Sequence, residues 1–169
     1  MRKTVMMTRT FRIVTSLLSF MFSLDTLAHD STAHYMANEG LMVEHGDTKI
    51  LFDPLFRNSY GQYLLLPEEM EQALFAGVAP YDGVDAIFVS HHHGDHFSPG
   101  DMVRLLREQP NIKLYAPTQA VIAMRSESSN NDADLFDRVI GVSLEYKDAP
   151  VALSMAGLQI EAEIGRAHV

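Results

Sequence analysis

Six consecutive residues, His91 to His96, constrain what this chain can fold into more than any other part of its sequence. They read His-His-His-Gly-Asp-His, and they follow residues 84–90, an apolar stretch rich in β-branched side chains. Such a stretch between turn signals is typical of a buried strand. The chain has no cysteine, so a metal site must use imidazole, carboxylate and water, which zinc, iron and manganese accept. The sequence therefore predicts a metal-binding loop at the end of a buried strand.

The spacing within this loop predicts which side chains face an ion. Residues two apart on an extended chain point the same way, so His91 and His93 can offer their imidazoles to one metal ion. Gly94 lacks a Cβ atom and permits a sharp turn, which leaves Asp95 and His96 free to face a second ion. The alternative is an accidental, solvated cluster of histidines that binds no metal ion. The aspartate spacing and the preceding strand favour the metal site, because structural context strengthens a motif.

Strand and helix patterns alternate on both sides of the loop. The expected strands are residues 40–44, 49–52, 84–90, 112–116, 139–146, 151–155 and 158–163. The expected helices are residues 67–78, a helix that begins after the N-cap Ser98, and a short helix from its cap Thr118 to Arg125, followed by a loop at residues 126–134. This order predicts a layered α/β domain with helices packed on a sheet.

Two motifs of this chain resemble those of a known family. A strand followed by His-x-His-x-Asp-His resembles the second motif of the metallo-β-lactamase superfamily. Upstream, Ile50–Pro54 reads Ile-Leu-Phe-Asp-Pro and is similar to the first motif, an aspartate that ends a strand of the first hairpin. The resemblance covers roughly residues 35–125. It implies a four-layer αββα fold, of which this chain holds mainly the first half.

The resemblance also implies a metal centre with two divalent ions, foremost zinc, with iron or manganese as alternatives. The implied ligands are His91 and His93 for the first ion and Asp95 and His96 for the second. Asp53 would fix the site through hydrogen bonds to the ligands, although an Asp-Pro pair is also a common start of a turn. His92, at the variable position of the motif, would not be a ligand.

The function that the resemblance implies is hydrolysis of a small molecule. A metal-activated water would attack an ester, lactone, amide or phosphodiester, and Asp95 is the candidate catalytic carboxylate that holds or moves the proton. Two alternatives stay open: a non-catalytic metal-binding protein or inactive half-domain, and an iron-dependent redox enzyme of the same fold. A formal net charge of -9 makes the chain a poor candidate for binding nucleic acid, which needs a basic surface. The oligomeric state is left open.

The N-terminal residues have the pattern of a secretory signal peptide. Basic residues precede a mostly apolar stretch at residues 13–24, and Thr26-Leu27-Ala28 offers a small-residue cleavage site. We expect residues 1–28 to be removed, which makes the protein secreted or periplasmic without a stable membrane span. The alternative is a retained anchor or a disordered tail. Residues 29–38 are expected to be a linker, and residues 39–163 the metal-binding domain.

The C-terminal residues 164–169 read Ile-Gly-Arg-Ala-His-Val, a string that a common sequencing-library adapter could encode in frame. We therefore expect a non-native tail and an incomplete domain. Later motifs of the resembling family supply a third histidine for the first ion, a bridging aspartate and a last histidine. His168 is the only histidine after the loop, and on spacing alone it is a candidate third ligand.

Overall fold

A computed structural model describes residues 31–155 and 158–164 of the chain. The expected signal peptide at residues 1–28 and the candidate ligand His168 lie outside the described residues, so both stay predictions. Within the described part of the chain, no helix is long and apolar enough to cross a membrane.

The described strands form a six-stranded mixed sheet and a separate hairpin. The sheet contains, in spatial order, β1 (Ser31–Ala37), β2 (Gly40–His45), β3 (Thr48–Phe52), β4 (Ala86–Phe88), β5 (Lys113–Pro117) and β6 (Val139–Val142). The first three strands pair antiparallel, and β3 to β6 pair in parallel. The hairpin consists of β7 (Val151–Met155) and β8 (Leu158–Ala162). The parallel half of the sheet is the part that positions the site.

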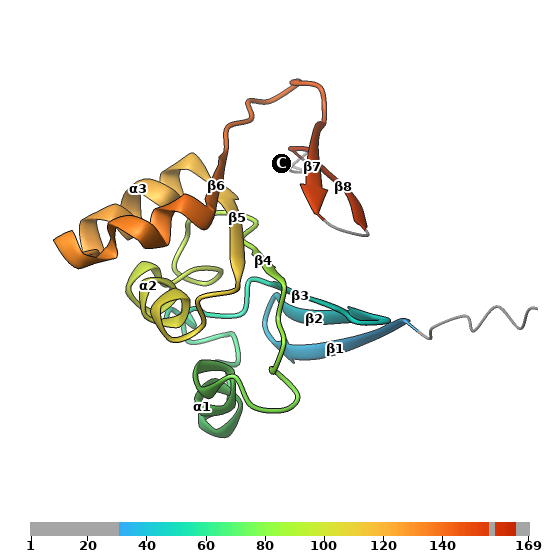
Figure 1. The fold of residues 1–169 in the computed structure, drawn as a ribbon, viewed down its shortest axis with the longest axis vertical. Coiled ribbons are helices and arrows are strands. Elements are labelled where there is room, and N and C mark those ends of the chain that lie inside the picture. The colour runs from blue at the N-terminus through green and yellow to red at the C-terminus, as the bar shows by residue number, and fades with distance from the viewer. Residues whose placement is uncertain (1–30, 156–157, 165–169) are drawn as a thin grey trace, which may run out of the picture.

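The helices lie on one face of the sheet, and the hairpin lies on the opposite side (Figure 1). They are α1 (Glu68–Ala76), α2 (Pro99–Glu108), α3 (Thr118–Glu127) and the 3-10 helix η1 (Asn130–Arg138). The expected α/β fold is confirmed, and the described residues supply a helical layer, a sheet and part of a layer on the second face. This arrangement is consistent with a partial αββα domain.

Side chains of the central strands alternate between two apolar clusters. Leu51, Ile87 and Leu114 are fully buried and pack toward the helices. Phe88 and Tyr115 point to the other face, where their rings stack with centroids 4.8 Å apart. Both faces of the parallel strands are therefore covered, which explains why these strands read as continuous apolar runs.

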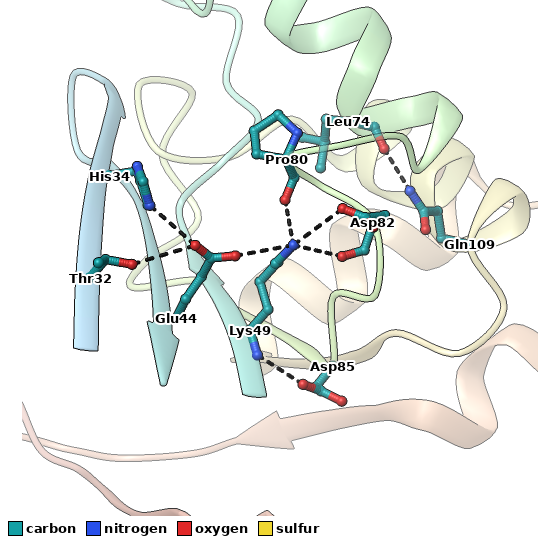
Figure 2. A network of polar contacts seen from close by, with 9 residues as sticks. All are labelled: Thr32, His34, Glu44, Lys49, Leu74, Pro80, Asp82, Asp85 and Gln109. Carbon is teal, nitrogen blue, oxygen red and sulfur yellow. Dashed lines mark hydrogen bonds and ion pairs between the residues drawn. The ribbon is translucent and has the colours of Figure 1, made fainter. Parts of the chain in front are cut away.

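A cluster of polar contacts around Lys49 fixes the amino end of β3 (Figure 2). The Lys49 ammonium group donates to the carbonyl oxygen of Asp82 at 2.7 Å and lies 3.2 Å from the Glu44 carboxylate. The backbone N–H of Lys49 donates to Asp85 Oδ2 at 2.9 Å. These contacts join β2 and β3 to the segment that leads into β4. They hold the register of the strands from the end opposite the metal loop.

The expected linker at residues 29–38 was wrong for most of its length. Residues Ser31–Ala37 form the edge strand β1, which pairs with β2. Its first five residues are exposed, so the strand has no continuous buried face of the kind that indicates a core strand. The strand forms because its backbone groups pair with β2, with a register shift between Tyr35 and Ala37.

The expected loop at residues 126–134 was also wrong. Helix α3 continues to Glu127, and η1 occupies residues Asn130–Arg138. A capping box starts η1: the backbone N–H of Ser129 donates to the Asp132 carboxylate at 2.6 Å, and the backbone of Asp132 contacts the Ser129 side chain in return. Ser129 Oγ also donates to this carboxylate, at 2.8 Å. Arg107 of α2 donates two further hydrogen bonds to this carboxylate. The polar composition of this segment therefore does not indicate the capped 3-10 helix, which Arg107 joins to α2 through hydrogen bonds.

Several expected boundaries and caps shift. The strand expected at residues 84–90 is regular only over Ala86–Phe88, and the one expected at residues 139–146 ends at Val142. Ser98 occupies the N-cap position of α2, but its hydroxyl donates to the Asp101 side chain at 2.6 Å and accepts no capping hydrogen bond from a backbone N–H of the helix. Thr118 is the first residue of α3 and not its cap. Its hydroxyl donates to the carbonyl of Val142 at 3.4 Å.

Replacing Asp132 with Asn tests the clamp between η1 and α2. Hydrogen bonds from Arg107, and then from Ser129, hold the pKa of Asp132 well below its usual range. A carboxyl whose pKa is lowered by folding stabilises the folded state above its unfolded pKa, and this stability is lost as the pH falls through the folded pKa. The variant should therefore unfold at lower urea concentration near pH 7, and its deficit should shrink as the pH falls below about 4. Urea titrations near pH 7 and below about pH 4 measure the loss of stability in the variant. A loss of stability that is independent of pH would contradict the clamp.

Candidate metal centre

The carboxyl ends of β3 and β4 bring two distant segments together at one edge of the sheet. The two strands run parallel with Phe52 opposite Phe88, so the residues that follow them are neighbours. Asp53 follows β3, and its backbone N–H donates to the carbonyl of Phe88 at 3.0 Å. Loop residues 90–96 follow β4. The ends of parallel strands are where ligands bind in open α/β sheets, and this edge carries the predicted metal loop.

Asp53 is buried beneath the loop and accepts three hydrogen bonds. The residue is almost fully buried, at 3% exposure. Oδ1 accepts from the backbone N–H of Ser90 at 2.7 Å, and Oδ2 accepts from Ser90 Oγ at 2.5 Å. Oδ2 also lies 2.8 Å from His96 Nδ1. The backbone of Asp53 has a φ of 39°, in the left-handed region that Asp tolerates better than most residues.

These contacts determine which nitrogen of each imidazole carries the proton and which keeps its lone pair. An ionised carboxylate can only accept hydrogen bonds, so His96 must carry its proton on Nδ1, which leaves the lone pair on Nε2. Ser90 Oγ donates its proton to Asp53 and lies 3.3 Å from His91 Nδ1. A proton on Nδ1 of His91 can point at this oxygen, so Nε2 of His91 is free as well. One buried carboxylate, directly and through one hydroxyl, thus orients both rings.

His91, Asp95 and His96 form the group that could hold a metal ion. One ligand atom from each of them lies within 4.8 Å of the others, and all three residues are partly buried. Two imidazoles and one carboxylate are the three protein ligands that a catalytic zinc site uses while keeping one position open. Burial, followed by the proximity of His96 and His93, lowers the pKa of His91. A neutral imidazole is the form that binds a metal, so this donor set fits a divalent ion.

His93, the second expected ligand of the first ion, lies beside the three-residue group. It is not part of the three-residue group, and its ring centroid lies 4.8 Å from that of His91. The carbonyl of His93 accepts hydrogen bonds from His96 N at 3.0 Å and from Phe97 N at 2.9 Å. The chain therefore turns at His93, and the alternation of an extended strand does not apply beyond His91. His92 also lies outside the group and stacks at an angle on His93.

The segment after Asp53 anchors the turn of the metal loop. The carbonyl of Gly94 accepts from the backbone N–H groups of Arg57 at 3.2 Å and Asn58 at 2.9 Å. A Cβ on Gly94 would lie 3.1 Å from Asn58 Cβ, so glycine is the residue that fits this approach. The Arg57 side chain also bonds Glu71 of α1 and Asp101 of α2. The loop is therefore fixed to two helices through one segment.

Sequence analysis did not identify Ser90 and Arg57 as parts of the site. No pattern in the sequence indicates that the hydroxyl of Ser90 donates to Asp53. Arg57 lies in an irregular stretch whose partners are 14 and 44 residues away. The one usable signal was the position of Ser90, directly before the first histidine of the loop.

A cleft of about 710 Å³ extends from the loop between the sheet and the hairpin. Ser90 and His91 line one end of it, and His92 lies beside them. The stacked rings of Phe88 and Tyr115 form part of its apolar wall. One candidate metal ligand thus borders a space large enough for a small organic molecule.

Comparison with known proteins decides the family. The sequence model of the metallo-beta-lactamase superfamily matches residues 40–153, which include Asp53 and the whole metal loop. The chain belongs to this superfamily. The match begins in β2 and ends in β7, so it covers the parallel strands that carry the site.

Two curated proteins that are similar to this chain carry UPF0173 names. A protein of Aeropyrum pernix named UPF0173 metal-dependent hydrolase is 30% identical over 132 residues, which cover 75% of this chain and 47% of the relative. The UPF0173 protein YddR of Bacillus subtilis is 32% identical over 91 residues, which cover 49% of this chain and 34% of the relative. The chain therefore spans half or less of the length of these curated relatives.

Proposed function

We propose that this chain is a metal-dependent hydrolase of small molecules that uses His91, Asp95 and His96 as metal ligands. The single observation that carries the proposal is the grouping of their ligand atoms within 4.8 Å of one another. The hydrogen bonds of Asp53 support it, because they occupy Nδ1 of His96 and leave Nε2 to bind an ion. The printed name of the Aeropyrum pernix relative, a metal-dependent hydrolase, agrees with this chemistry.

Each residue of the site has a distinct task in this proposal. His91 and His96 bind the ion through Nε2, and Asp53 and Ser90 hold their rings in the binding orientation. Asp95 offers one carboxylate oxygen to the ion and can hold a proton on the other. A divalent ion, when bound, supplies a hydroxide nucleophile at neutral pH and polarises the bond to be cleaved. Zinc suits the donor set best, and iron or manganese would also accept it.

The proposed substrates are small esters, lactones, amides or phosphodiesters. The cleft beside His91 has more apolar than polar lining and ends at the metal loop, so it can take the non-reacting part of such a molecule. His93, whose ring centroid lies 4.8 Å from that of His91, could bind the second ion expected from the sequence.

A metal-exchange assay tests the proposal. Purified protein is stripped with a chelator, reloaded separately with zinc, manganese or iron, and offered nitrophenyl esters, a lactone, an anilide and bis(nitrophenyl) phosphate. We expect hydrolysis of at least one substrate class that disappears on stripping and returns with one metal. The His92→Ala variant is the matched control, because His92 lies in the same loop outside the ligand group. Hydrolysis that survives complete metal removal would contradict the proposal.

A further inference from the structure

Three consecutive carbonyl groups of the metal loop are held by hydrogen bonds from three different sources. The carbonyl of His93 accepts from N–H groups further along the loop, and that of Gly94 accepts from Asn58 N at 2.9 Å. The carbonyl of Asp95 accepts from the side-chain amide Nδ2 of Asn38 at 2.8 Å. This third bond comes from a side chain 57 residues away in sequence. It reaches the one residue of the three that belongs to the ligand group.

Asn38 extends from a turn that is fixed in place. The turn joins β1 to β2, and the two residues before it, Met36 and Ala37, are buried at 5% and 2% exposure. On the other side, a Cβ on Gly40 would lie only 2.8 Å from the carbonyl oxygen of Ala37. The backbone around Asn38 is thus tightly packed on both sides. Its amide can act as a rigid support for the loop.

The backbone of Asn38 explains only part of the residue choice. Its φ of 44° lies in the left-handed region, which glycine adopts freely and asparagine more easily than most residues. Glycine would meet this requirement as well as asparagine. The amide group therefore adds something that the turn itself does not need, and its one described partner is the carbonyl of Asp95.

We propose that Asn38 is a positioning residue for the metal centre. By holding the carbonyl of Asp95, it fixes the peptide unit that joins Asp95 to His96, and hence the directions in which both side chains leave the backbone. The inference rests on the proposed function, because it needs these two residues to bind an ion. It assigns a role in metal binding to the β1–β2 turn, which supplies none of the three proposed ligands.

The inference predicts a specific loss of metal affinity. Removing a hydrogen-bonding partner of a metal ligand typically lowers affinity about 10–100-fold. Asn38→Gly keeps the left-handed backbone and removes the amide, so we expect its zinc dissociation constant to rise about 10-fold. Asn38→Asp tolerates the same backbone but places a carboxylate oxygen against the carbonyl of Asp95, and its dissociation constant should rise further.

The test measures zinc binding and folding separately. Zinc is titrated into the metal-free chain in competition with a chelating dye, for the unsubstituted chain, both Asn38 variants and Glu39→Gln. Glu39 is the exposed neighbour of Asn38 in the turn, so its variant is the matched control and should bind zinc as the unsubstituted chain does. Thermal unfolding of each metal-free protein reports on the turn alone, and Asn38→Gly should melt close to the unsubstituted chain.

The outcomes separate the inference from the proposed function. Weakened zinc binding in both Asn38 variants with an unchanged control supports the inference. Unchanged zinc binding in either folded Asn38 variant overturns it, including the case in which only the melting temperature falls. If Asn38→Gly does not fold, Asn38→Asp decides the question. Absence of zinc binding by the unsubstituted chain would defeat the proposed function, and the inference with it.

Discussion

Replacing His91, Asp95 and His96 together with alanine should abolish both metal binding and hydrolysis. Zinc sites with four protein ligands bind with about 10–16 kcal/mol, or roughly 3 kcal/mol per ligand. Each ligand lost should therefore weaken binding on the order of 100-fold, and loss of all three leaves no site at micromolar metal. Because the three side chains are only partly buried, the fold should survive. Metal content by mass spectrometry and circular dichroism of the same sample measure both effects.

Two single variants are the controls for this result. His92→Ala removes an imidazole from the same loop and should leave metal content and hydrolysis unchanged, since His92 is outside the ligand group. His93→Ala tests whether the unsubstituted chain binds one ion or two. The variant should bind one ion per chain. If the unsubstituted chain binds two, this fall from two ions to one would assign His93 to the second ion. A triple variant that keeps its full metal content would show that the ion binds elsewhere.

Replacing Asp53 with Asn, which exchanges one carboxylate oxygen for an NH₂ group, should cause the second-largest loss of zinc affinity. Asp53→Asn keeps a residue that tolerates the φ of 39°, and its Oδ1 can still accept from the N–H of Ser90. Its NH₂ group, however, would replace the oxygen that lies 2.8 Å from His96 Nδ1. Nδ1 must then accept a hydrogen bond, which places the ring proton on Nε2, the atom that the ion needs. We expect zinc affinity to fall about 10–100-fold.

Nitrogen NMR of the metal-free protein can observe this change directly. In the unsubstituted chain the proton of the neutral His96 ring should be on Nδ1, and in Asp53→Asn it should be on Nε2. Asp47→Asn makes the same chemical change in an exposed turn and should alter neither the tautomer nor the affinity for zinc. A His96 ring that keeps its Nδ1 proton in Asp53→Asn, together with undiminished affinity, would refute the role assigned to Asp53.

The sequence was sufficient to predict the parts of the site that lie within one strand–loop–helix unit. The apolar run before His91 and the Pro99 that opens α2 are local signals, and the structure has β4 and α2 on either side of the loop. These features depend on periodicity and turn chemistry, which are visible in a single sequence.

The remaining features depend on contacts between distant segments. The grouping of His91 with Asp95 and His96 could not be predicted, because it results from a turn that begins at the carbonyl of His93. Most of the strand β1 is exposed, so its pairing with β2 and not a buried apolar face identifies it as part of the sheet. The same applies to Asn38, whose amide acts on a loop 57 residues away.

Diffraction from a crystal of the zinc-loaded protein, recorded on both sides of the zinc absorption edge, tests the central claim most directly. The account predicts an anomalous difference peak about 2.0–2.2 Å from Nε2 of His91, Nε2 of His96 and a carboxylate oxygen of Asp95. Asp53 should remain outside the coordination shell and bonded to His96 Nδ1. A zinc peak that is bound by other residues, or no peak near these three side chains, would contradict it.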